Sequence, residues 1–375
     1  MLLAKTMKTP LHQAHIELGA RMAPFGGWDM PIQYDGILIE HEQTRARAAI
    51  FDICHMGEFD LRGTTAEADL ERLLTMNVAS IQVGQCRYGY LLRDDGSPID
   101  DLTCYRRAKD HFMLVVNAGT REGDAAWIKS NLSPGTTFTD ISPATGKLDI
   151  QGPTSREEME RVFGVQLPDL KYFWFADITL LGSPCTLSRT GYTGEWGYEL
   201  YMPRAESRRF WDALLKKGNI KPAGLGCRDT LRLEVGYPLY GHELGPGQTP
   251  VAAARGSFID TKKEFIGRAA CVRDLQNGCP RYLAGLKLES RRAARAHDKV
   301  MSGGNVVGEI TSGSLAPSLG IAVALAYLDA ALCKPGQIVQ IPVQGGKSLN
   351  ATVVELPFYK NGTARRVSTE HTEKH

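Results

Sequence analysis

Polar and apolar residues alternate along residues 86–105, and this alternation predicts a β-hairpin. The apolar positions of its first strand are Tyr88, Tyr90 and Leu92. A turn at residues 95–96 (Asp-Gly) precedes the returning strand at residues 99–105. A pair of acids, Asp100 and Asp101, lies at the mouth of the hairpin. Because neighbouring residues on a strand point to opposite faces, we expect at most one of these carboxylates to face any one pocket.

The segments on either side of this hairpin alternate between strand and helix patterns. Strands are predicted at residues 57–63 and 111–116, and helices at residues 66–76 and 119–132. This order predicts an α+β layer with an antiparallel sheet. Further strands are expected within residues 142–152 and 178–202, followed by an amphipathic helix at residues 203–217.

The pattern changes from about residue 281 to short strands separated by glycine and proline turns, which is typical of a small all-β barrel. The expected strands cover residues 283–288, 305–312, 320–328, 338–343 and 351–356. We therefore predict two α+β lobes in residues 1–275 and a barrel domain in residues 281–360. Residues 361–375 form a polar tail that we expect to be disordered.

The length of 375 residues exceeds the size at which a single core keeps growing, which agrees with two or three domains. A formal net charge of +2 argues against a protein that coats nucleic acid. The eight cysteines occur singly, without zinc-ligand spacing, and favour reduced thiols in a cytoplasm. No apolar run approaches the length of a bilayer span, so we expect no membrane partner.

Asp100 is the first candidate for chemistry. A carboxylate among Tyr88, Tyr90, Ile99 and Leu102 would lose solvation, which favours its neutral form and suits it to proton handling. The alternative is an ordinary aspartate beside a turn that accepts hydrogen bonds from nearby backbone amides.

Two glycine-rich segments carry further candidates. Residues 191–199 combine three glycines with Glu195 and Glu199, and a carboxylate facing a cavity can accept a pair of N–H donors from an aminopyrimidinone ring. The alternative is a glycine-bent corner with solvated acids. Residues 223–237 place Arg228 at the start of a short helix, which can bind an anion. This segment lacks the third glycine of a dinucleotide fingerprint, so nucleotide binding is excluded.

Seven spaced motifs, taken together, resemble those of the aminomethyltransferase (T-protein) family of the glycine cleavage system. They begin at Gly26, Phe51, Ile99, Val115, Gly191, Arg228 and Thr311. The resemblance runs in order from about residue 9 to residue 360. One departure is Ser97-Pro98, where the family more often has a glycine before the acid pair.

This resemblance implies a three-lobed, folate-binding aminomethyltransferase fold. It implies transfer of the methylene of a lipoyl-bound aminomethyl group to tetrahydrofolate, with release of ammonia and 5,10-methylenetetrahydrofolate. Tetrahydrofolate would be the co-substrate, no metal would be needed, and the partner would be the lipoylated carrier, the H-protein.

The resemblance also assigns roles to individual residues. Asp100 resembles the acid against the folate nitrogens, Glu199 the carboxylate that recognises the pterin, and Arg228 an arginine of the folate pocket. The residues expected to line the pocket are Met56, Tyr88, Asn117 and Tyr192. We expect Glu199 and Arg228 to be satisfied mainly by the ligand.

Two alternatives remain at the level of the sequence. One is a folate-dependent demethylase or methyltransferase that acts on a small methylated donor and needs no carrier protein. The other is a non-catalytic folate-binding protein with the same fold.

Overall fold

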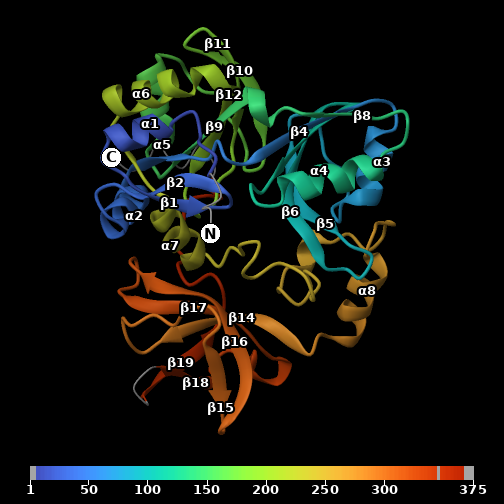
Figure 1. The fold of residues 1–375 in the computed structure, drawn as a ribbon, viewed down its shortest axis with the longest axis vertical. Coiled ribbons are helices and arrows are strands. Elements are labelled where there is room, and N and C mark those ends of the chain that lie inside the picture. The colour runs from blue at the N-terminus through green and yellow to red at the C-terminus, as the bar shows by residue number, and fades with distance from the viewer. Residues whose placement is uncertain (1–5, 344–346, 367–375) are drawn as a thin grey trace.

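A six-stranded sheet and a five-stranded sheet lie side by side above a closed barrel in the computed structural model, which describes residues 6–343 and 347–366 (Figure 1). The six-stranded sheet and its helices form what we term the first lobe, and the five-stranded sheet forms the second lobe. The predicted α+β layers followed by an all-β barrel are therefore confirmed.

The sheet of the first lobe has the strand order β10-β11-β12-β9-β3-β13. Its strands are β3 (Ala48–Asp52), β9 (Thr145–Gln151), β10 (Phe175–Leu180), β11 (Ser183–Ser188), β12 (Gly197–Pro203) and β13 (Ile220–Pro222). Neighbouring strands are antiparallel except β13 and β3, which are parallel. The helices of this lobe are α1 (His12–Glu17), α2 (Ile37–Ala46), α5 (Ser155–Phe163), α6 (Ser207–Lys217) and α7 (Leu225–Glu234). A hairpin of β1 (Arg21–Phe25) and β2 (Trp28–Gln33) lies beside them.

The second lobe has the strand order β5-β6-β7-β4-β8, with every neighbouring pair antiparallel. Its strands are β4 (Gly57–Arg62), β5 (Cys86–Leu92), β6 (Pro98–Ala108), β7 (His111–Val116) and β8 (Thr137–Asp140). Its helices, α3 (Ala66–Leu73) and α4 (Arg121–Ser130), cover one face of the sheet. The predicted hairpin at residues 86–105 is present as β5 and β6.

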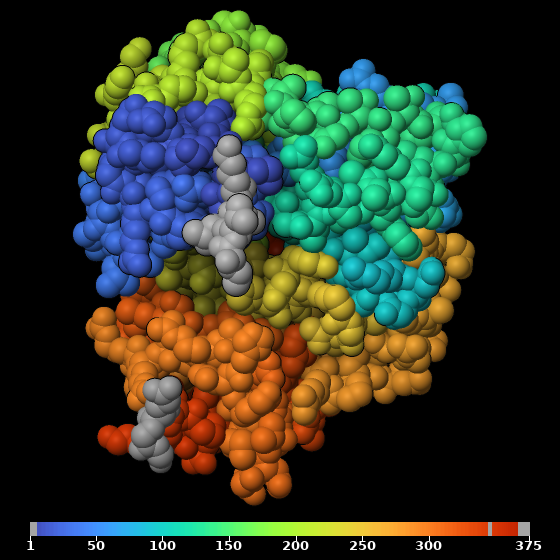
Figure 2. Space-filling model, in the orientation of Figure 1, coloured from blue at the N-terminus to red at the C-terminus, as the bar shows by residue number. Residues whose placement is uncertain are grey.

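The barrel closes in the order β14-β17-β16-β15-β18-β19. Its strands are β14 (Arg281–Leu288), β15 (Lys299–Ser302), β16 (Asn305–Ala316), β17 (Ile321–Asp329), β18 (Ile338–Val343) and β19 (Lys347–Val354). Strand β15 was not among the expected strands. Helix α8 (Arg268–Asn277) precedes the barrel. The segment that joins α7 to α8, yellow in Figure 2, lies between the two lobes and the barrel.

Each sheet has one apolar face covered by helices. Leu148, Ile150 and Leu200 of the first lobe pack with Phe210 and Trp211 of α6 in one core. A second core joins the apolar face of the five-stranded sheet to α3 and α4. Since strand residues alternate between faces, the opposite faces of the two sheets carry the remaining, more polar side chains. We call these the inner faces.

The expectation of disorder from residue 361 onward is wrong for the first residues of that tail. Thr363 and Ala364 are buried, and the Thr363 hydroxyl donates to Oε2 of Glu195 at 2.5 Å. The backbone N–H of Trp196 donates to the same hydroxyl at 2.7 Å. The polar composition of this tail did not predict its docking, because the tail binds through hydrogen bonds to a buried carboxylate and a backbone amide of the first lobe. The rest of the tail, residues 367–375, lies outside the described residues.

Candidate functional site

The register of the central hairpin decides which acid reaches the inner face. Tyr90 pairs with Asp101 and Leu91 pairs with Asp100, and a bulge follows at Leu92, which pairs with Pro98. Asp101 therefore shares the inner face with Tyr88 and Tyr90, whereas Asp100 shares the helix-covered face. The prediction that the two acids face opposite ways is confirmed.

Asn117, at the end of β7, connects the two acids. Its Nδ2 lies 2.7 Å from Oδ1 of Asp100 and 2.9 Å from Oδ1 of Asp101, and its backbone N–H donates to Asp100 at 2.9 Å. The Tyr88 hydroxyl donates to Oδ2 of Asp101 at 2.8 Å. Tyr88 and Asn117, both expected to line the pocket, therefore orient the Asp101 carboxylate.

The surroundings of these acids favour proton handling. Burial, and then the charge of Asp100, raise the pKa of Asp101 to about 7. Burial, and then the charge of Asp124 in α4, raise the pKa of Asp100 well above its ordinary value. The side chain of Asp100 is 0% exposed. In this structure Asp100 therefore reaches the inner face only through Asn117, while Asp101 is partly exposed there.

The inner face of the first lobe carries a row of polar side chains on β9 and β12. In register, Tyr201 pairs with Lys147 and Glu199 pairs with Asp149. The hydroxyls of Tyr201 and of Tyr105, from the inner face of the second lobe, lie 3.0 Å apart. The two inner faces therefore meet at these tyrosines.

Glu199 already has partners within the protein. Its Oε2 lies 3.1 Å from Nζ of Lys147, and the Tyr201 hydroxyl donates to it at 3.0 Å. Burial opposes ionisation of Glu199, but the charges of Lys147 and Arg228 lower its pKa below the ordinary value. The expectation that Glu199 is satisfied mainly by a ligand is therefore wrong, because Lys147 projects from the neighbouring strand.

Arg228 is likewise paired, with Asp149. Its guanidinium carbon lies 5.0 Å from the centre of the Tyr192 ring, and the Tyr192 hydroxyl donates to the carbonyl of Pro238. Burial raises the pKa of Asp149, although the charge of Arg228 opposes this. Oδ1 of Asp149 has no hydrogen-bond partner within residues 6–343 and 347–366. Arg228 is thus also satisfied internally, while Asp149 keeps one oxygen for a donor.

Met56 marks the edge of this polar region. It packs in the cluster that contains Tyr105 and Tyr201, and its Sδ lies 3.6 Å from Nζ of Lys147. Met56 also lines a cavity of about 200 Å³, together with Trp28, Cys54, Arg121, Ser142, Pro143 and Arg204.

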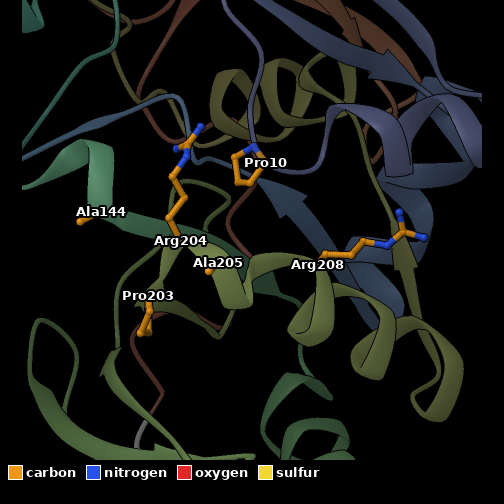
Figure 3. A pocket seen from close by; sticks show the side chains of 6 residues that line it. All are labelled: Pro10, Ala144, Pro203, Arg204, Ala205 and Arg208. Atoms are coloured by element: carbon orange, nitrogen blue, oxygen red, sulfur yellow. The ribbon is translucent and has the colours of Figure 1, made fainter.

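A wider groove of about 550 Å³ shares Arg204 with this cavity. Figure 3 shows the side chains of Arg204 and Arg208 on either side of Pro10 in this groove. Pro203, Ala144 and Ala205 complete its lining.

The two groups of expected residues approach each other at Tyr192. The charge of Asp101 in the second lobe and that of Arg228 in the first lobe both influence the pKa of Tyr192, which burial raises. The described part of the chain contains no group of three or more His, Cys, Asp or Glu residues arranged to hold a metal ion. In the same part, no helix is both long and apolar enough to cross a membrane.

Sequence reasoning missed Lys147, Asp149 and Glu58. Lys147, Asp149 and Gln151 alternate with the apolar residues Leu148 and Ile150, which is a strand pattern with one polar face. All three polar side chains are nevertheless buried, with at most 1% exposed. The alternation could have identified the row, but only the packing of the lobes reveals that it faces inward.

Comparisons with known proteins match nearly the whole chain. The family model described as the GCVT N-terminal domain matches residues 11–263, and that of the glycine cleavage T-protein C-terminal barrel domain matches residues 281–360. An aminomethyltransferase of Moorella thermoacetica is 41% identical over 363 residues, which cover 96% of this chain and 99% of that protein. One from Desulfitobacterium hafniense is 38% identical over 358 residues, with 94% and 98% covered.

The fold agrees with a solved structure as well. The crystal structure of a glycine cleavage system aminomethyltransferase T from Bartonella henselae superposes with a TM-score of 0.90 at 32% sequence identity. The match covers 97% of this chain and 99% of that chain.

Proposed function

Because the chain belongs to the glycine cleavage T-protein family, we propose that its two inner faces hold tetrahydrofolate between Asp101 and the group formed by Glu199 and Arg228. The chain is a tetrahydrofolate-dependent aminomethyltransferase of glycine cleavage. The observation that carries the folate site is the meeting of two polar inner faces at Tyr105 and Tyr201.

The residues present fit the ring system of a reduced folate. That ring offers several N–H donors on a flat body, and the region between the lobes offers acceptors and aromatic side chains. Oδ1 of Asp149 is a buried acceptor that lacks a hydrogen-bond partner in the described chain. Tyr88 and Tyr192 provide flat apolar surface. Buried acceptors without partners are costly, so a ligand with N–H donors gains affinity there.

In the proposed reaction N5 of tetrahydrofolate attacks the methylene carbon of the aminomethyl group, and ammonia leaves. Closure of the ring through N10 then releases the lipoyl thiol. N5 must be unprotonated to attack, and positive charge develops on it as the new bond forms. A partly desolvated carboxylate beside N5 and N10 stabilises this charge and accepts the proton.

Asp101 is the carboxylate that we assign to this contact, and Asp100 becomes a positioning residue. Asp100 as the catalytic acid remains a prediction from the sequence. Its lack of exposed surface and its place beneath α4 favour a role through Asn117, which holds both carboxylates. Met56, Tyr88, Asn117 and Tyr192 keep their proposed place around the folate.

A lipoylated carrier, the H-protein, is the proposed donor. A carrier must present its arm at the surface, and exposed arginines can attract an acidic partner. Arg291, Arg292 and Arg295 at the start of the barrel are exposed and are candidates for this contact. Eight free cysteines, seven of them buried, fit a reducing cytoplasm as the proposed location.

The experiment supplies the enzyme with tetrahydrofolate and one of two donors. The first is an aminomethyl-lipoylated carrier, and the second is a set of small methylated amines. We expect 5,10-methylenetetrahydrofolate and equimolar ammonia from the carrier alone. Methyl transfer from the methylated amines to tetrahydrofolate without a carrier, which forms 5-methyltetrahydrofolate because no oxidant is supplied, would replace the proposed donor. Folate binding without product from either donor would leave a non-catalytic folate-binding protein.

A further inference from the structure

Lys147 lies near two carboxylates, one from the first lobe and one from the second lobe. Its side chain is 1% exposed, and its Nζ is paired with Glu199 of the same sheet at 3.1 Å. The other carboxylate is that of Glu58 on β4, which is 2% exposed. Glu58 pairs with Val115 in the second-lobe sheet, and Val115 packs with Tyr105 and Tyr201. By strand alternation Glu58 therefore faces inward, toward Lys147.

Glu58 is poorly satisfied in this arrangement. Its Oε1 has no hydrogen-bond partner in the part of the chain that the structure describes. Burial raises the pKa of Glu58 to about 8, and the charge of Lys147 is the strongest influence in the opposite direction. The other charged groups that act on Glu58 are Arg121 of α4, Asp140 of β8 and Glu199 of β12. Glu58 is therefore mostly protonated at neutral pH, and among the positive charges that act on it Lys147 has a larger effect than Arg121.

We propose that Lys147 changes its ion-pair partner when folate binds, which we call the exchange. N–H donors of the pterin replace Lys147 at Glu199, and the ammonium of Lys147 then pairs with Glu58. This inference rests on the proposed folate site. It makes Lys147 and Glu58 positioning residues, which prepare Glu199 for the ligand without reacting themselves.

The physical reason is that neither charge can be left alone in a buried site. Removing one partner of a buried ion pair is strongly destabilising, because the remaining charge is uncompensated. Two N–H donors of the ligand can replace the hydrogen bonding of Nζ at Glu199, and Nζ then needs another anion. Glu58 supplies that anion by releasing its proton to solvent, so the binding of one folate is coupled to the release of up to one proton.

The first test measures this proton by calorimetric titration with 5-methyltetrahydrofolate at pH 7 in two buffers with different enthalpies of ionisation. Asp101 can also exchange a proton on binding, but it does so in both proteins, so we expect the wild-type enzyme to release up to one proton per ligand more than Glu58→Gln. Glu289→Gln, on the exposed start of the barrel, is the matched control and should behave as wild type. Equal numbers of protons released by the wild type and by Glu58→Gln would overturn the exchange.

The second test removes the shared cation. Lys147→Met removes the cation paired with Glu199 and leaves only the Tyr201 hydroxyl bonded to it, so we expect a lower Tm without ligand but a larger rise in Tm with 5-methyltetrahydrofolate than in wild type. Lys216→Met changes the same residue type at an exposed position, where the Lys216 side chain is 76% exposed, and should alter neither value. A smaller rise in Lys147→Met would contradict the exchange.

These outcomes are separable from failure of the proposed function. If the wild-type enzyme neither binds folate nor forms product, the folate site itself is wrong. If the wild-type enzyme binds folate and turns over but releases no more protons than Glu58→Gln, only the exchange is wrong.

Discussion

At the residue scale, the carboxylates of Asp100 and Asp101 differ in what surrounds them. Asp101 lies with Tyr88 on the inner face, whereas Asp100 is fully buried toward α4. Asp101→Asn keeps the shape and removes the charge, so we expect turnover at saturating folate to fall by about 10²- to 10⁴-fold. Thermal unfolding should show that the fold is intact.

Asp100→Asn is the partner variant for this comparison. It should cost less turnover, because Asn117 can still hold Asp101. A larger loss in Asp100→Asn than in Asp101→Asn, with both proteins folded, would restore Asp100 as the group that contacts the folate. If neither variant loses activity, a carboxylate at this hairpin is not part of the reaction.

The pH dependence of turnover tests the roles of Asp100 and Asp101 independently. The pKa of Asp101 is about 7, raised by burial and then by the charge of Asp100. If the ionised form of Asp101 accepts the proton of N5, turnover should rise with pH through about 7. Without the charge of Asp100 the pKa of Asp101 should be lower, so in Asp100→Asn the increase in turnover should occur at lower pH. An unshifted profile in that variant would show that Asp100 does not act on the titrating group.

In the same hairpin, some features follow from the sequence and others do not. Its two strands and the opposite orientation of the acids follow from the period of two. The choice between the acids depends on the bulge between Leu91 and Leu92 and on which face the helices cover. Glu199 and Arg228 were identified as site residues, but their pairing with Lys147 and Asp149 needs the register of β9 with β12 and the approach of α7.

At the element scale, α7 is positioned by a close backbone contact. Gly224 precedes the helix, and a Cβ atom there would lie 2.3 Å from the backbone C and O of Ile32 in β2. Its N–H also donates to Glu40 of α2 at 2.8 Å. The helix can therefore approach β2 only because residue 224 lacks a side chain.

Gly224→Ala should push α7 away from β2 and move Arg228 with it. We expect a loss of about 1–3 kcal/mol in the free energy of unfolding, together with weaker binding of tetrahydrofolate. Chemical denaturation and calorimetric titration measure the two effects. Gly123→Ala is the control, because Gly123 lies within α4 with open space around its Cα and should gain stability. Unchanged stability of Gly224→Ala would mean that α7 is not held by this contact.

The elements themselves were largely predictable, since long amphipathic or alternating segments carry a strong signal. Helix α6 and strands β5 and β6 are examples. Strand β15, with four residues, is too short to show a period. The contact of Gly224 with β2 joins positions almost two hundred residues apart, and no local sequence pattern predicts it.

At the scale of the whole molecule, Glu234 at the end of α7 joins the first lobe to the barrel. Its carboxylate accepts from the backbone and hydroxyl of Ser318 at 2.8 Å each, and it is paired with Arg45 of α2 at 2.9 Å. His41 of α2 lies 3.1 Å from the same carboxylate. The side chain of Glu234 is 0% exposed. Its bonds to Ser318 join the first lobe to the barrel, whereas Arg45 and His41 belong to the first lobe.

Glu234→Ala should weaken this junction by about 1–3 kcal/mol, because Ser318 loses both of its bonds to Glu234, while Arg45 keeps Glu195 as a partner. We expect thermal unfolding by calorimetry to separate into two transitions, with the barrel melting apart from the other lobes. Glu289→Ala, on the barrel surface, should unfold as wild type does. A single transition with unchanged Tm in Glu234→Ala would show that the lobes are coupled elsewhere.

The docking of Thr363 against Glu195 and Trp196 has a consequence for the synthesis of the chain. The two partners of the Thr363–Glu195 contact are 168 residues apart, and the contact satisfies a buried carboxylate of the first lobe. A ribosome delivers residue 195 long before residue 363, at roughly 5–20 residues per second. The first lobe therefore waits many seconds, with its glutamate lacking this partner, while the second half of the chain is translated. Its final packing is an event that follows translation of the barrel, and a nascent chain truncated before residue 363 should remain more sensitive to proteases around residues 194–197 than the finished protein.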